Sequence, residues 1–226
     1  GGRPGRPFNA WIRRWPLLGP VLLASLLDRR GYDARVYNEN FSGPLPANTE
    51  AFDDVCSADV VGISCMTPTA RRAYELADMI RARSARPTIV FGGVHPTFRP
   101  DEAVADGDVV VRGEGETLIE AIAAGEITSG IVNAEPAADL DALPAPDHRL
   151  IRDFDRQVRH GEGPLRYELP LMASRGCPFG CSYCSVTRMF GRKVRRQSVN
   201  RVYSDLLEYM DRGFQHFFFY DDNFTS

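Results

Sequence analysis

The sequence has little that would tie the protein to a membrane or to nucleic acid. Its one candidate membrane segment, the apolar run from Leu17 to Leu27, is too short to span a bilayer and contains Gly19-Pro20. Arginines before the run give it some likeness to a secretory signal. The run continues into Asp28-Arg29-Arg30-Gly31, which is typical of a helix end, so we predict a buried helix over 18–30, with a targeting signal as the alternative. The formal net charge of −3 gives no general attraction to nucleic acid or anionic lipid, and neither is expected as a partner.

Paired cysteines are also lacking. The chain has five cysteines, an odd number, and three of them fall within eight residues. This distribution argues against a disulfide framework and favours a metal or redox role in the reducing cytoplasm.

Helices and strands alternate over the first 133 residues. Helical spacing of apolar residues predicts further helices over 70–83 and 117–124. Short apolar runs predict strands over 34–38, 59–64, 88–93, 108–113 and 130–133. This alternation predicts an α/β domain, Rossmann-like, with a parallel sheet covered by helices on both faces. Such folds usually open with a strand, whereas this chain opens with a Gly/Arg/Pro-rich loop and a helix, so the first strand is missing or the domain is atypical.

The rest of the chain predicts only part of a second domain. Residues 134–150 carry three prolines and several acids and are predicted to be a linker. A strand over 167–174, a helix over 198–211 with Ser198 as N-cap, and a strand over 216–224 follow. One strand–loop–helix–strand unit is too little for a domain. We therefore expect domain boundaries at 1–133, 134–150 and 151–226, with the last domain cut off.

The stretch "ASRGCPFGCSYCS" places Cys177, Cys181 and Cys184 on one loop with the spacing C-x3-C-x2-C. Three thiolates so close can converge on one metal centre. A zinc site usually needs a fourth ligand nearby, and neither His160 nor His216 has a zinc-finger spacing. An iron–sulfur cluster can use three protein thiolates and leave one iron open. The open alternatives are zinc and a set of buried structural thiols.

The segment "CPFGCSYC" resembles the signature of the radical S-adenosylmethionine (SAM) superfamily, with the three cysteines in the positions of its cluster ligands. The resemblance implies a [4Fe-4S] cluster whose open iron binds SAM, and reductive cleavage of SAM to a deoxyadenosyl radical. It places Phe179 and Tyr183 in the SAM site. It also places Asp221 and Asp222 of "YDDNF" where the superfamily contacts the amino group of SAM, although many members have Gly-Gly-Glu there; an Asx-turn that ends the strand is the alternative. The following basic run, Arg188 to Arg196, is expected to meet the SAM carboxylate or a charged substrate, or to be solvated.

Three strand ends of the first domain are rich in small residues: "SCMTPT" (64–69), "GGVHPT" (92–97) and "RGEGE" (112–116). In parallel sheets ligands bind at such ends, and the absence of G-x-G-x-x-G argues against a dinucleotide. With the cysteines downstream, the order of these segments resembles the cobalamin-binding domain of cobalamin-dependent radical SAM enzymes. The resemblance implies a cobalamin site formed by ten residues: Ser64, Met66, Thr67, Gly92, Gly93, Val94, His95, Gly113, Glu114 and Gly115.

His95 departs from one familiar cobalamin motif. Carriers of the methionine-synthase type use D-x-H-x-x-G, whose His ligates cobalt, but Gly93 stands where that Asp would be. We expect His95 to pack against or hydrogen-bond the corrin or its tail, with cobalt ligation and a purely structural role as alternatives. The resemblance implies cobalamin bound with its base displaced and no His below cobalt.

The function expected from the resemblance is methyl transfer from cobalamin to an unactivated carbon of a small-molecule substrate, with flavodoxin or ferredoxin as electron donor. A non-methylating radical enzyme, such as an oxidative tetrapyrrole-type cyclase, fits the same motifs. A corrinoid- or metal-binding module without catalysis is the alternative of a different class. Catalytic residues beyond the cofactor ligands and the substrate itself are not defined by the sequence.

Overall fold

A computed structural model describes residues 17–154 and 168–225. Their backbone contacts group the chain into two compact units, which we describe separately. The first unit comprises Gly1–Pro44, Asp139–Cys177 and Lys193–Ser226, and the second comprises Leu45–Ala138 and Pro178–Arg192. The predicted loop before residue 17 lies outside the described residues. The predicted boundaries at 133 and 151 stay a prediction, since the two units interleave along the chain rather than follow each other.

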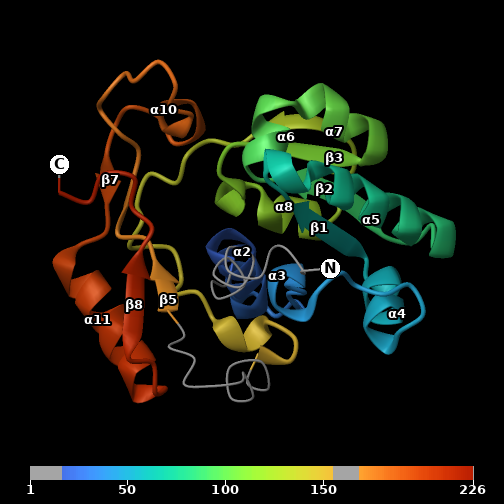
Figure 1. The fold of residues 1–226 in the computed structure, drawn as a ribbon, viewed down its shortest axis with the longest axis horizontal. Helices are drawn as coiled ribbons and strands as arrows, with labels where there is room; N and C mark the ends of the chain where they lie inside the picture. The colour runs from blue at the N-terminus through green and yellow to red at the C-terminus, as the bar shows by residue number, and fades with distance from the viewer. Residues whose placement is uncertain (1–16, 155–167, 226) are drawn as a thin grey trace, which may run out of the picture. The chain divides into compact units, whose positions relative to one another are not determined.

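The second unit is built on a four-stranded parallel sheet (Figure 1). Its strand order, β1-β2-β3-β4, follows the chain without reversal. The elements are α4 (Glu50–Ser57), β1 (Val60–Ser64), η1 (Thr67–Thr69), α5 (Ala70–Arg83), β2 (Thr88–Gly92), α6 (Val94–Phe98), α7 (Pro100–Asp106), β3 (Val109–Arg112), η2 (Gly115–Thr117), α8 (Ile119–Ala123), β4 (Gly130–Asn133) and α10 (Val186–Met189). The strands predicted over 59–64, 88–93, 108–113 and 130–133 are confirmed, and so is the parallel α/β class.

Composition explains why this sheet forms. β2 and β3 are rich in β-branched residues, and Ile89, Val109 and Val110 are fully buried, as expected for strands covered on both faces. The register Val60↔Thr88 to Ser64↔Gly92 brings the carboxyl ends of β1 and β2 level. Arg112, at the carboxyl end of β3, pairs with Asn133 at the end of β4. Helix α5 buries Ala70, Ala73, Ala77 and Ile80, the helical spacing that the sequence predicts.

The first unit contains a smaller parallel pair. Its elements are α2 (Leu18–Arg29), α3 (Glu39–Ser42), η3 (His148–Leu150), β5 (Glu168–Leu171), β6 (Ser174–Arg175), β7 (Arg195–Arg196), α11 (Val199–Asp211) and β8 (His216–Phe219). β5 pairs in parallel with β8, and β6 pairs antiparallel with β7. Ser198 caps α11 by accepting a hydrogen bond from the backbone of Arg201 (3.1 Å), as predicted.

Two local predictions are wrong. Residues 34–38 form no sheet strand, because Val36 makes only an isolated bridge to Ile151. The last strand ends at Phe219 rather than 224, because the backbone turns from Asp222 onward. The helices α4, α6, α7 and α10 were not predicted; they are short, between four and eight residues, so their apolar periodicity is weak.

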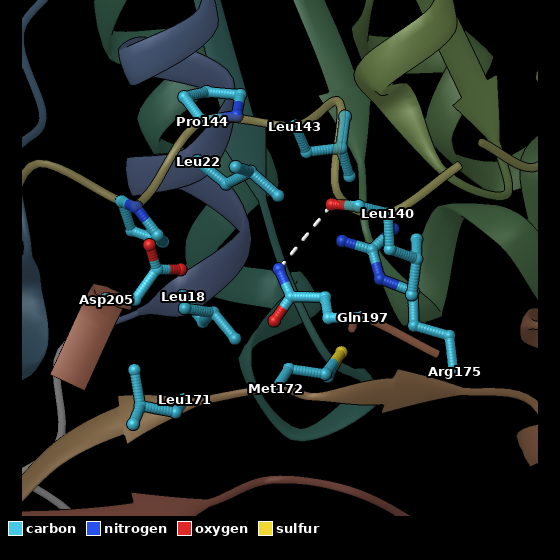
Figure 2. A pocket seen from close by; sticks show the side chains of 11 residues that line it. Leu18, Leu22, Leu140, Leu143, Pro144, Leu171, Met172, Arg175, Gln197 and Asp205 are labelled. Atoms are coloured by element: carbon cyan, nitrogen blue, oxygen red, sulfur yellow. Dashed lines mark hydrogen bonds between the residues drawn. The ribbon is translucent and has the colours of Figure 1, made fainter. Parts of the chain in front are cut away.

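Part of the predicted linker packs inside the first unit. Ser25 of α2 accepts a hydrogen bond from the Asp147 backbone (2.8 Å), and Tyr209 of α11 donates one to the Pro146 carbonyl (2.8 Å). A small cavity of about 40 Å³ lies between this segment, α2 and β5 (Figure 2). It is far too small for a cofactor, since ligand pockets usually enclose at least about 300 Å³.

None of the helices among the described residues is both long and apolar enough to cross a membrane.

The histidine at the start of η3 is part of the apolar core. His148 is 2% exposed and packs its ring against Phe154 and Tyr209. Burial lowers the pKa of His148 to about 4; the Asp147 carboxylate acts in the opposite direction, and the Arg212 guanidinium adds to the lowering. Within the described residues neither ring nitrogen has a hydrogen-bond partner. The folded protein therefore holds this ring in its neutral form.

This burial predicts a loss of stability in acid. Below about pH 6.5 the unfolded chain binds a proton at His148 that the folded protein does not, so the free energy of unfolding falls as pH drops from 6.5 to 4 and levels off below. The loss amounts to about 3 kcal/mol. His148→Phe keeps an aromatic ring in the core and removes this titration. Urea unfolding of both proteins between pH 7.5 and 4 should show the variant losing less stability; parallel curves would contradict the assignment.

Candidate functional site

The ends of β1, β2 and β3 carry the predicted cobalamin-site residues, all within the second unit. Backbone bonds join the first two loops: Cys65 N–H donates to the Gly92 carbonyl (3.2 Å), and His95 N–H donates to the Cys65 carbonyl (3.2 Å). Ser64, Met66 and Thr67 are exposed along the loop after β1. The structure thus gathers the first two predicted segments on one edge of the sheet.

Thr97 joins the loops after β2 and β3. Its hydroxyl donates to the Gly93 carbonyl (2.8 Å) and accepts from Gly113 N–H (3.0 Å). The Thr97 carbonyl accepts from the Arg112 side chain (3.1 Å). Thr97 was not among the predicted site residues, and its place in "GGVHPT" was the available signal. Through it all three strand ends form one connected surface.

Two glycines let the backbone run close to its neighbours here. Gly93 has φ of +95° and ψ of −165°, a conformation open essentially to glycine alone. A Cβ at Gly93 would lie 2.9 Å from the Ser64 Oγ, and one at Gly113, also at positive φ, would lie 3.3 Å from the Ala134 carbonyl. Gly92, by contrast, has open space where a Cβ would stand. The backbone at Gly93 and Gly113 thus lies too close to its neighbours to carry a side chain without strain.

His95 is buried beneath this surface and both its ring nitrogens are engaged. Nδ1 lies 3.2 Å from the Thr67 hydroxyl, and Nε2 lies 3.0 Å from the Tyr74 hydroxyl and 3.2 Å from a carboxylate oxygen of Glu102. The ring is 5% exposed, so it has no free nitrogen to offer a cobalt ion. The geometry favours the structural alternative for His95, with its influence on a ligand passing through Thr67. Glu114, also predicted for this site, is buried, at 4% exposure.

The cysteines divide into two kinds by exposure. Cys56 and Cys65 are buried, and burial raises the pKa of both thiols, that of Cys65 to about 11. Cys181 is exposed, and Cys177 and Cys184 are partly exposed. The buried pair is therefore held as inert thiols, while the loop thiols are accessible to a metal.

The cysteine loop is accessible to solvent over most of its length. Cys184 N–H donates to the Cys181 carbonyl (3.1 Å), which closes a tight turn between these two residues. Phe179 and Tyr183 are 58% and 90% exposed, so neither belongs to the core. A Cβ at Gly180 would collide with the guanidinium of Arg192, which places that cation against the loop. Among the described residues, no three His, Cys, Asp or Glu side chains already converge as metal ligands.

The turn after β8 lies beside the segment that leads into Cys177. Tyr220 N–H donates to the Leu171 carbonyl (2.7 Å), and Asp221 accepts hydrogen bonds from Ala173 N–H (3.0 Å) and from the Ser174 hydroxyl. Both Asp221 oxygens thus bind the segment before Cys177, which is neither the SAM contact nor the local Asx-turn that the sequence suggests. Partial burial and then the neighbouring Asp221 raise the pKa of Asp222.

The fold and these loops define a cofactor-binding protein with a parallel sheet. The family model "B12 binding domain" matches residues 13–123. An uncharacterized methyltransferase of Pyrococcus horikoshii is 31% identical over 93% of this chain and 49% of its own length. Bacteriochlorophyllide d C-12(1)-methyltransferase of Chlorobaculum tepidum is 26% identical over 91% of this chain and 43% of its own. The anaerobic magnesium-protoporphyrin IX monomethyl ester cyclase of Rubrivivax gelatinosus is 27% identical over 88% and 40%.

Solved structures agree on the fold. The cobalamin-dependent SAM radical enzyme OxsB, with aqua-cobalamin bound, matches 96% of this chain and 33% of its own with a TM-score of 0.75 and 18% identity. The radical SAM methyltransferase TsrM from Kitasatospora setae matches 93% and 46% with a TM-score of 0.71 and 18% identity. Residues 13–123 match the B12-binding domain family, and the chain as a whole is similar to methyltransferases and cyclases and, in its fold, to cobalamin-dependent radical SAM enzymes. It spans less than half the length of these curated relatives.

The backbone at Gly93 gives a direct test of the strand-end surface. Gly93→Ala places a side chain in a glycine-only conformation and against Ser64, so we expect the free energy of unfolding to fall by about 1–3 kcal/mol. Gly92→Ala is the matched control, with open space at its Cβ; it should keep its stability in urea unfolding and weaken cobalamin binding. Equal stability of the two variants would contradict the described backbone.

Proposed function

We propose that this chain is the cobalamin- and cluster-binding portion of a radical SAM enzyme that methylates an unactivated carbon of a small-molecule substrate. One observation carries the proposal: a C-x3-C-x2-C loop with accessible thiols follows β5 in a chain whose first half is a B12-binding domain. Methyltransferases among the relatives support methylation over other radical chemistry. The domain division at 133 and 151, an external flavodoxin- or ferredoxin-type electron donor and a cytoplasmic location belong to the same proposal.

The donor chemistry of the cysteine loop fits an iron–sulfur cluster. Cys177, Cys181 and Cys184 provide three accessible thiols, which leaves one iron of a [4Fe-4S] cluster without a protein ligand. A bound cluster would supply the electron for reductive SAM cleavage, and cobalamin the methyl group. Zinc remains the rival metal, and it lacks an evident fourth ligand in the loop.

Different residues of the chain are proposed to contact the ammonium and carboxylate groups of SAM. Asp222 is the acid proposed to meet the SAM ammonium group, since Asp221 is engaged with Ala173 and Ser174. Arg192, which lies against Gly180 of the loop, is proposed to meet the SAM carboxylate. The exposed rings of Phe179 and Tyr183 flank the same loop.

Cobalamin is proposed to lie on the strand-end surface of the second unit. Gly92, Gly93 and Gly113 allow close approach of the corrin to the backbone, and Ser64, Met66 and Thr67 border it. Val94 and Gly115, next to these glycines, complete the loops. His95 holds Thr67 in place without touching cobalt.

An oxidative cyclase is the second candidate, favoured by the cyclase relative. An experiment with methyl-labelled SAM distinguishes a methyltransferase from a cyclase. A methyltransferase moves the label into a product that gains one methyl group, which mass spectrometry detects, whereas a cyclase leaves the label in methionine. A corrinoid-binding module without catalysis produces neither a labelled product nor deoxyadenosine.

The difference in exposure between the loop thiols and the buried thiols gives a specific prediction. Changing Cys177, Cys181 or Cys184 singly to Ala should reduce iron to a small fraction of the wild-type content after anaerobic reconstitution, because each supplies one ligand. Cys56→Ala is the matched control, since its thiol is buried in α4, and should retain full iron. Iron content and visible absorbance measure the effect. Retention of iron in the loop variants would contradict the cluster assignment.

A further inference from the structure

Asn223 reaches the first cysteine of the loop. Its side-chain Nδ2 lies 4.0 Å from the Cys177 Sγ, at the outer limit of an N–H···S hydrogen bond. Asn223 follows Asp221 and Asp222 in "YDDNF"; the sequence analysis assigns those two acids, but not Asn223, to the SAM site. Both residues belong to the first unit.

The turn that presents Asn223 is fixed to the segment that presents Cys177. Asp221 accepts hydrogen bonds from Ala173 N–H and the Ser174 hydroxyl, four and three residues before Cys177. The parallel register of β5 and β8 brings Leu171 opposite Phe219, so the two strands end together. The segments that carry Asn223 and Cys177 are therefore joined by hydrogen bonds close to the contact between these two residues.

The segment before Cys177 is held from its other side as well. Ser174 and Arg175 pair with Arg196 and Arg195, and Gln197 N–H donates to the Ala173 carbonyl (2.8 Å). Ser174 and Arg175 are buried. The backbone leading to Cys177 thus has hydrogen bonds on both sides, and Cys177 has little freedom to move away from Asn223.

We propose that Asn223 is a positioning residue for the cluster: it holds Cys177 and donates its amide N–H to the ligating sulfur. The inference rests on the proposed function, in that it requires a cluster on Cys177. A donor to a ligating thiolate stabilises the more negative, reduced cluster and so raises its reduction potential. Asn223 would thereby make reduction of a bound cluster by the proposed external electron donor easier.

Two variants test this role. Asn223→Ala removes the side chain, and Asn223→Asp keeps its shape but replaces the donor with a carboxylate. Asn200→Ala, at an exposed position near the start of α11, is the matched control. Each protein is reconstituted anaerobically with iron and sulfide, its iron content is measured, and its cluster is titrated against dithionite with EPR detection.

We expect both Asn223 variants to bind as much iron as wild type and to have more negative midpoint potentials, with the Asp variant the lower of the two. Asn200→Ala should match wild type. Full iron with an unchanged potential in both Asn223 variants would overturn the inference. If Asn223→Ala loses iron, the midpoint potential of Asn223→Asp alone tests the inference: a more negative value supports it, and an unchanged value overturns it. A wild-type protein that binds no iron would overturn the proposed function instead, so the two failures are distinguishable.

Discussion

Parallel strand pairing is the constraint on which both candidate sites depend. Parallel neighbours end on the same edge of a sheet, so the loops that follow them meet there. In the second unit, the loops after β1, β2 and β3 lie at one edge of the four-stranded sheet. In the first unit, the loops after β5 and β8 lie at one edge of a separate two-stranded sheet. The hydrogen-bonding groups of these loops lie beyond the ladder, and those that are buried need partners within the protein. Thr97 in one unit and Asp221 in the other provide such partners.

Polar side chains that hydrogen-bond within the protein in this way are not free to bind a ligand. Asp221 uses both carboxylate oxygens within the protein, and His95 uses both ring nitrogens. In the proposed sites, the groups left for a ligand are therefore Asp222 in the first unit, and the glycines and the exposed Thr67 in the second.

Much of this fold could be predicted from the sequence. The apolar runs over 59–64, 88–93 and 108–113 are local signals, and the structure confirms them as β1, β2 and β3. The orientation of a particular side chain was not predictable in this way. Nothing local shows that Asp221 faces Ala173 or that His95 faces Tyr74, since those contacts join residues 48 and 21 positions apart. Thr97 and Asn223 were missed for the same reason. The strand expected over 34–38 failed because Val36 finds only Ile151 as a partner, 115 residues away.

The central claim is that this chain holds both an iron–sulfur cluster and cobalamin. The most direct measurement is the content of iron, acid-labile sulfide and cobalamin per chain after anaerobic reconstitution of the wild-type protein with all three supplied. The account predicts about four irons, about four sulfides and one cobalamin. Zinc in place of iron would contradict the radical mechanism, and iron without cobalamin would contradict the assignment of the strand-end surface.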